Sequence, residues 1–102
     1  MDHTNELIKI LLDKTTSDAE RDDAAMDLGF ILNDETVEVA LLNVANDKKT
    51  DEMIRASCGE SLAQIWIGHN QVSREKLALL TGIAMDEAIK LIKKENMEYT
   101  LE

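Results

Sequence analysis

Proline is absent from the sequence and glycine occurs only four times, so few residues interrupt a helix or force a tight turn. Aromatic residues are also scarce, with one Phe, one Tyr and one Trp making up 3% of the chain. Any core must therefore consist mainly of aliphatic side chains. The abundant residues, chiefly Ala, Leu, Ile, Glu, Lys and Asp, favour helix over strand.

A single cysteine, Cys58, leaves no possibility of an internal disulfide, which is typical of a reducing compartment. No apolar run approaches the roughly 18 residues that a membrane span needs. The first ten residues, MDHTNELIKI, lack the basic segment and long apolar stretch of a signal peptide. We therefore expect a cytoplasmic protein that has no membrane partner.

Basic residues are in the minority, since 11 Lys and Arg stand against 21 Asp and Glu, and the net charge is -10. Such a charge repels nucleic acid and attracts basic proteins. With 44% hydrophobic residues, the 102-residue chain is expected to fold as one domain, 1–102, around a modest core. We expect a basic protein partner, no direct contact with nucleic acid, and no indication of a homo-oligomer.

Apolar residues recur at helical spacing along most of the chain. Ser17, followed three residues later by Glu20, has the form of a capping box at a helix start. Asn33 or Asp34 is expected to cap the next helix, and Ser73 a later one. Gly82 is interpreted as the end of the helix that Ser73 begins. The predicted helices cover residues 5–13, 18–32, 34–45, 51–67, 73–81 and 84–96.

Two of these predicted helices carry the same pattern, in which Arg55 of the second copy corresponds to Arg21 of the first. Each pattern occupies an arc of about 120° on its helix, which predicts a buried stripe. The helices that precede them repeat at the same offset, with residues 7–16 corresponding to 41–50. A period of about 34 built from two helices is typical of an α-solenoid. The stripes are Arg21, Ala24, Ala25, Leu28, Ile31 and Leu32, and then Arg55, Cys58, Gly59, Leu62, Ile65 and Trp66.

The two stripes resemble the short HEAT-like repeats known from phycobilin lyases, in which an arginine is followed by two small residues, a leucine and a small residue. The resemblance covers about residues 5–67, with Glu20 where an aliphatic residue is usual. It implies an all-α fold, a short right-handed α-solenoid of about three stacked antiparallel helix pairs. The expected units are about 5–33, 34–67 and 72–97, and the third lacks the arginine.

Arg21 and Arg55 lie within the predicted buried stripes, so each guanidinium needs a partner. An aspartate precedes each arginine at the same offset, Asp13 in the first copy and Asp47 in the second. A guanidinium can bind a carboxylate through two parallel hydrogen bonds. We therefore predict two structural pairs, Arg21 with Asp13 and Arg55 with Asp47.

Residues that could carry catalysis are few. His3 and His69 have no Cys or His neighbour at metal-binding spacing, so no metal is expected. Cys58 occupies a small-residue position of the second stripe, which favours a buried filler over a nucleophile. The sequence contains no phosphate-binding loop and no nucleophile elbow. We expect a protein without enzymatic activity and without a cofactor.

One predicted helix face is unusually rich in acidic residues. Eight acidic residues and one base, Arg21, occur between Asp18 and Glu38. On the outward face of the helix predicted over 18–32, aspartates surround a Met and a Phe four positions apart, which lets these two touch. This pattern predicts a hydrophobic anchor with an acidic rim. The predicted partner-binding residues, with their equivalents in the second copy, are Asp22, Asp23, Met26, Asp27, Phe30, Glu60 and Gln64.

A different interpretation of this face remains open, in which Phe30 folds back over a neighbouring helix and the aspartates only keep the chain soluble. The size, charge and predicted fold resemble those of bacterial immunity proteins, antitoxins that neutralise basic nuclease toxins. That resemblance implies occlusion of a toxin's active or substrate-binding surface, with Met26 and Phe30 filling a pocket. Two other functions are open: a scaffold or adaptor subunit of a larger complex, and a lyase-like or chaperone-like accessory protein.

Overall fold

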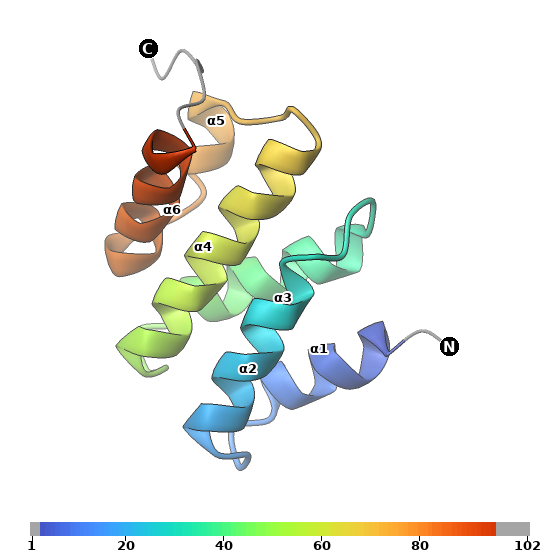
Figure 1. Ribbon diagram of the computed structural model, residues 1–102. Coiled ribbons are helices and arrows are strands. Elements are labelled where there is room, and N and C mark those ends of the chain that lie inside the picture. The colour runs from blue at the N-terminus through green and yellow to red at the C-terminus, as the bar shows by residue number, and fades with distance from the viewer. Residues whose placement is uncertain (1–2, 96–102) are drawn as a thin grey trace.

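The structure is a computed structural model that describes residues 3–95, and every regular element in that range is a helix (Figure 1). The prediction of an all-α fold is therefore confirmed. No helix in this range combines the length and the apolar character that crossing a membrane requires. The helices are α1 (Thr4–Leu12), α2 (Asp18–Leu28), α3 (Glu35–Ala45), α4 (Glu52–Gly68), α5 (Arg74–Leu77) and α6 (Gly82–Lys94).

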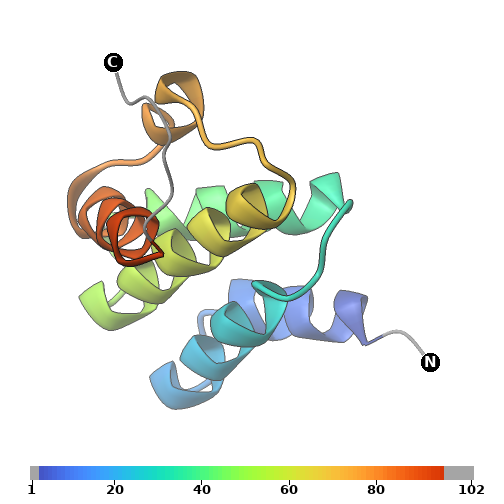
Figure 2. The same ribbon diagram turned by 45° about the horizontal axis from the view of Figure 1, so that its top comes forward.

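The helices form two layers, as Figures 1 and 2 show. In one layer α2, α4 and α6 lie side by side and run in the same direction, with α4 in the middle. Behind them α1 packs on α2 and α3 packs on α4, while α1 and α3 also touch each other. The short α5 makes only slight contact with α6. Consecutive helices therefore pair as α1 with α2 and α3 with α4, whereas α6 packs mainly on α4.

Capping side chains set the start of most helices. The Ser17 hydroxyl accepts a hydrogen bond from the Glu20 backbone N–H at 3.2 Å and donates one to the Glu20 carboxylate at 3.0 Å. Asp34, and not Asn33, caps α3 by accepting from two backbone N–H groups of its first turn. Ser73 caps α5 through the N–H of Lys76. The predicted helix starts at these three caps are confirmed.

Three predicted helix ends are wrong or untested. α2 stops at Leu28 instead of residue 32, because the next N–H groups form tighter turns, such as Phe30 to the Asp27 carbonyl at 3.2 Å. Consequently Leu32 lies outside the buried stripe and is 42% exposed. α5 is a single turn, and Gly82, with a φ of 54°, begins α6 instead of ending α5. The predicted helix end at residue 96 lies outside the described residues, as does the end of the third predicted unit at residue 97.

The core lies between the two layers and is almost entirely aliphatic, as the composition predicted. Trp66 is its largest side chain and is fully buried, and its Nε1–H donates to the Glu38 carboxylate at 3.0 Å. Both predicted stripes contribute their central residues, and α3 contributes a complete buried face. The other large side chains with no more than 2% exposure are Leu11, Leu28, Leu41, Ile54, Leu62, Ile65, Leu80 and Ile92.

Small residues allow the helices of the front layer to approach closely. A Cβ added to Gly59 of α4 would lie 2.1 Å from the carbonyl oxygen of Ala84 on α6. On the other flank, a Cβ added to Gly29, just after α2, would lie 2.7 Å from the Ser61 hydroxyl of α4. Both distances are far shorter than van der Waals contact. Gly59 therefore sets the spacing between α4 and α6, and Gly29 that between α2 and α4.

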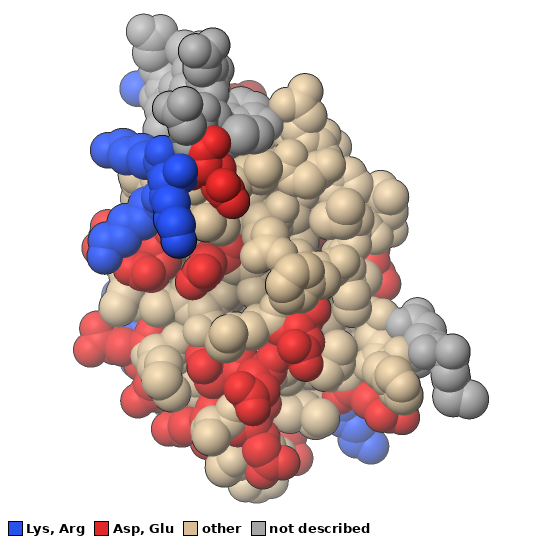
Figure 3. Space-filling view, viewed as in Figure 1, with Lys and Arg blue, Asp and Glu red and all other residues tan. Residues whose placement is uncertain are grey.

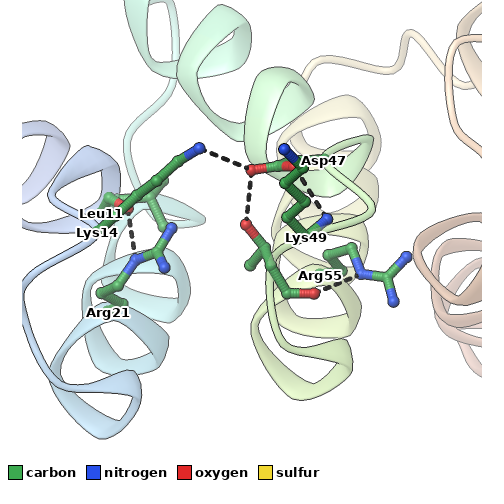
Figure 4. Close-up of polar contacts among 7 residues, drawn as sticks. Leu11, Lys14, Arg21, Asp47, Lys49 and Arg55 are labelled. Carbon is green, nitrogen blue, oxygen red and sulfur yellow. Dashed lines mark hydrogen bonds and ion pairs between the residues drawn. The ribbon is translucent and has the colours of Figure 1, made fainter.

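The two arginines bind backbone carbonyls and not aspartates (Figure 4). Arg21 Nε–H donates to the Leu11 carbonyl at 2.9 Å, and Arg55 Nε–H donates to the Thr50 carbonyl at 3.0 Å. No ion pair joins either arginine to Asp13 or Asp47 in the part of the chain that the structure describes. The predicted pairing is therefore wrong. The carbonyl of Leu11 lies in the last turn of α1, where it has no intrahelical partner, and the arginine supplies one.

Both aspartates instead accept hydrogen bonds within their own loops, and Asp47 also pairs with Lys14 of the other loop at 3.5 Å (Figure 4). Asp13 accepts hydrogen bonds from the backbone N–H of Thr15 at 2.9 Å and from its hydroxyl at 2.6 Å, and these bonds lower the pKa of its carboxyl. Asp47 accepts from the Lys49 N–H and the Thr50 hydroxyl, both at 3.0 Å, which likewise lowers its pKa (Figure 4). Local turn bonds of this kind form across two or three residues, and both loops carry a threonine at such a distance.

The two arginines provide a matched pair for a stability test. Arg21 is 5% exposed, so Arg21→Met leaves the Leu11 carbonyl buried without a donor, and we expect a loss of about 1–3 kcal/mol in the free energy of unfolding. Arg55 is only half-buried, so water can replace it, and Arg55→Met should cost less than about 1 kcal/mol. Urea denaturation followed by circular dichroism measures both. Equal losses of unfolding free energy in the two variants would contradict the claim that Arg21 stabilises the fold more than Arg55 does.

The close approach of α4 and α6 gives a second stability prediction. Gly59→Ala places a methyl group against the backbone of α6, so we expect a loss of about 1–3 kcal/mol despite the better helix propensity of alanine. Gly68→Ala is the control, because its Cβ meets only the flexible end of the Leu32 side chain, at 3.2 Å. Thermal denaturation should show a lower midpoint for the first variant alone. A midpoint raised by Gly59→Ala would show that the two helices lie further apart.

Candidate protein-binding surface

The predicted hydrophobic anchor is exposed. Met26 on α2 is 52% exposed and Phe30, two residues beyond that helix, is 74% exposed. An exposed fraction this large means that Phe30 does not fold back over a neighbouring helix, so that part of the alternative interpretation is wrong. In Figure 3 acidic side chains gather over α2 and the beginning of α4, whereas basic side chains gather over α6. The face therefore carries an apolar pair within a negatively charged area.

A hollow of about 150 Å³ lies between α2 and α4, and we call it the α2–α4 hollow. It brings together four of the predicted binding residues, two from each copy of the repeat. The structure adds two serines that the sequence interpretation missed. The lining residues are Met26, Phe30, Ser57, Glu60, Ser61 and Gln64.

Both serines hold α4 against α2. The Ser57 hydroxyl donates to the Asp22 carboxylate at 2.5 Å, and the Ser61 hydroxyl donates to the Ala25 carbonyl at 2.6 Å. Asp22 is consequently half-buried and tied to α4, instead of forming part of a free rim. The repeat held a signal for the serines, because they take the places in the second copy that Asp23 and Asp27 take in the first, on the same helix face.

The predicted acidic rim is divided between the two sides of α2. Asp23 and Asp27 line a second hollow of about 220 Å³, the α1–α2 hollow, together with Leu7 and Ile10 of α1. The aspartates predicted around Met26 therefore lie on two different flanks of α2. Neighbouring residues lie about 100° apart around a helix, so Asp23 and Asp27 point away from the side that Asp22 and Met26 share.

The exposed residues between the two hollows form a ridge, which we call the α2 ridge. It consists of Asp23, Met26, Asp27 and Phe30, all of them exposed. To a partner it offers the apolar side chains of Met26 and Phe30, the carboxylates of Asp23 and Asp27, and a hollow on each flank. All of this chemistry can recognise a cationic surface.

Other candidate sites are weaker. Cys58 is fully buried in the core, and burial raises the pKa of its thiol to about 12, so the reactive thiolate is suppressed. His69 accepts a hydrogen bond at Nε2 from the Asn33 backbone N–H at 2.9 Å, which assigns it a local role in joining two loops. Among residues 3–95, no three His, Cys, Asp or Glu side chains are grouped as metal ligands.

Comparisons of the chain with protein-family models, with curated proteins and with solved structures found no match. The function is therefore inferred from the chemistry of the surface itself.

The burial of Cys58 can be tested by alkylation. At pH 8 a thiol pKa raised from 9.0 to about 12 lowers the thiolate fraction by roughly a thousandfold, and burial blocks the reagent as well. We expect iodoacetamide to modify the protein rapidly in roughly 8 M urea, which unfolds a small domain, and only very slowly in buffer. Mass spectrometry measures both rates. Similar rates in the two conditions would show that the thiol is accessible in the folded chain.

Proposed function

We propose that this protein is a non-catalytic binding module that captures a basic protein on the α2 ridge and its flanking hollows. The observation that carries the proposal is Phe30, 74% exposed and four residues from the exposed Met26 in a strongly acidic surface. Burying apolar area in an interface contributes about 25 cal/mol per Å², so covering this pair favours association. Aromatic residues at the centre of an interface commonly carry a large part of the binding energy.

The charge of the chain favours the same kind of partner. The net charge of -10 attracts a cationic surface over a distance and accelerates its capture. Asp23 and Asp27 line the apolar α1–α2 hollow, and Glu60 lines the α2–α4 hollow, so carboxylates accompany both apolar areas. Long-range attraction and short-range apolar contact are therefore available on one face.

We further infer that the helices form a short, right-handed HEAT-like α-solenoid of about three pairs. Support comes from the constant offset that relates the two stripes and from the parallel course of α2, α4 and α6 in one layer (Figure 1). In such arrays the second helix of each pair lines the concave surface, where partners commonly bind. The α2 ridge and the α2–α4 hollow would then belong to that surface.

In its most concrete form, the proposal is an immunity or antitoxin protein of the bacterial cytoplasm that neutralises a basic nuclease toxin. A nuclease binds the phosphates of its substrate with basic side chains. The carboxylates of this face would bind those basic side chains in place of the phosphates. Met26 and Phe30 would fill a pocket of the toxin and thereby block access to its substrate-binding surface. Rapid capture, which a high opposite charge provides, suits a protein that must intercept a toxin before it acts.

The test is a pull-down with the purified protein, followed by mass spectrometry. We expect one basic partner that is retained at low salt and released at about 1 M salt, where the Debye length falls to about 3 Å. Phe30→Ala should weaken the captured complex by about 30-fold or more, as for a central aromatic residue. Asp23→Asn should weaken it less and reduce its salt dependence.

Matched controls lie on α3, in the other layer. Val39→Ala removes a side chain that is 49% exposed, and Glu35→Gln removes one exposed charge, so both should leave the affinity nearly unchanged. The proposal fails if no basic protein is recovered, or if the α2 variants and the α3 variants have the same effect. Several weak partners insensitive to Phe30→Ala would instead favour a scaffold or adaptor.

A further inference from the structure

The α2–α4 hollow presents mainly hydrogen-bond acceptors, and among its described lining residues only the Gln64 side-chain amide has protons left to donate, beside an acceptor oxygen of its own. The Ser57 proton is committed to Asp22 and the Ser61 proton to the Ala25 carbonyl, so each hydroxyl has only lone pairs left for the hollow. Glu60 adds an exposed carboxylate. No basic side chain is among the described residues that line the hollow. A guest that fits this lining must bring donors and a positive charge.

The walls on the α2 side are apolar. Met26 and the Phe30 ring border the hollow on the α2 side. Its volume of about 150 Å³ is close to that of cavities that hold one benzene-sized group, so it admits a single side chain and no helix or strand. The guest therefore needs an apolar stem or a flat face as well as its charge.

Arginine meets all of these requirements. Its guanidinium is planar, carries five donors and no acceptor, and stacks on aromatic faces such as that of Phe30. A carboxylate such as Glu60 can accept two parallel hydrogen bonds from it. A lysine ammonium is more strongly hydrated and cannot stack in the same way, so it gains less from these walls. We propose that the α2–α4 hollow is a socket for one arginine side chain of a partner protein.

The surroundings of Glu60 agree with a single external guest. Within residues 3–95 its side chain has no hydrogen bond or ion pair. On its far side lies another hollow, lined by Lys90 and Lys94 of α6, and Lys90 already pairs with Glu87 at 3.1 Å. The lysines on that side disfavour a second cation next to the first.

This proposal rests on the proposed function, since it specifies what the basic partner inserts. The probes are three blocked tripeptides of the form acetyl-Gly-X-Gly-amide, in which X is arginine, lysine or the uncharged arginine isostere citrulline. Titrations followed by ¹⁵N–¹H correlation spectra report both affinity and location. We expect the arginine peptide to shift the amides of Met26, Phe30 and residues 57–64 and to bind about two- to fivefold more tightly than the lysine peptide, with no saturable binding of citrulline.

Three variants separate the walls of the socket. Phe30→Leu keeps an apolar side chain but removes the ring, so it should lower the affinity for the arginine peptide to that for the lysine peptide. Glu60→Gln should lower the affinity for both the arginine and the lysine peptide. Glu35→Gln is the control, because it removes one exposed charge from α3 in the other layer and should leave both affinities unchanged. The same spectra show whether each variant is folded.

Equal affinities for the arginine and lysine peptides, unaffected by Phe30→Leu, would overturn the socket. Absence of binding by any peptide, or shifts confined to the α1–α2 hollow or to α6, would overturn it as well. The proposed function would stand in each of these cases if a basic protein is still captured and lost in Phe30→Ala. Binding of the arginine peptide without capture of any basic protein would instead support the socket and contradict the proposed function.

Discussion

The close packing of α4 between α2 and α6 is the constraint on which the rest of the structure depends. Gly59 allows the backbone of α6 to reach α4, and Gly29 leaves room for Ser61 on the other flank. At that spacing the hydroxyls of Ser57 and Ser61 reach α2 and bond to it. The hydrogen bonds that hold the front layer together thus also determine which atoms the α2–α4 hollow exposes.

The repeat explains why only its first copy is rich in aspartate. Ser57 and Ser61 of α4 are the repeat equivalents of Asp23 and Asp27 of α2. In the second copy this face packs against the preceding pair, so its residues are small. Within the described chain no helix pair precedes that of α1 and α2, and the equivalent face of α2 lines an open hollow. An exposed helix face is ordinarily polar, so Asp23 and Asp27 need no further reason to be there, whereas the exposed Phe30 does.

Much of the fold followed from the sequence, because helical periodicity, capping residues and the repeat are all local signals. The buried stripes were correct from Arg21 to Leu28 and from Cys58 to Trp66, although Arg55 is only half-buried. Asp34 and Ser73 cap as expected. The arginine partners were wrong, because sequence spacing cannot show that a nearby threonine satisfies Asp13 first. Helix ends depend on single turns and are hard to predict.

The candidate surface was predicted less completely than the fold. The sequence indicated an exposed apolar pair near carboxylates, and the structure confirms the exposure of Met26 and Phe30. The repeat placed Ser57 and Ser61 on this face, but the sequence could not show that their hydroxyls donate to α2. The division of the acidic residues between two hollows follows from the 100° step of the helix and could have been derived.

The most direct test of the central claim, that a basic protein binds over the α2 ridge, is site-specific photo-crosslinking. Benzoyl-phenylalanine replaces Phe30, whose exposed position accepts a larger ring, and in a second protein it replaces Val39, exposed on α3. Our account predicts that the captured basic protein is crosslinked from position 30 and not from position 39. Crosslinking from position 39 alone, or equally from both positions, would contradict it.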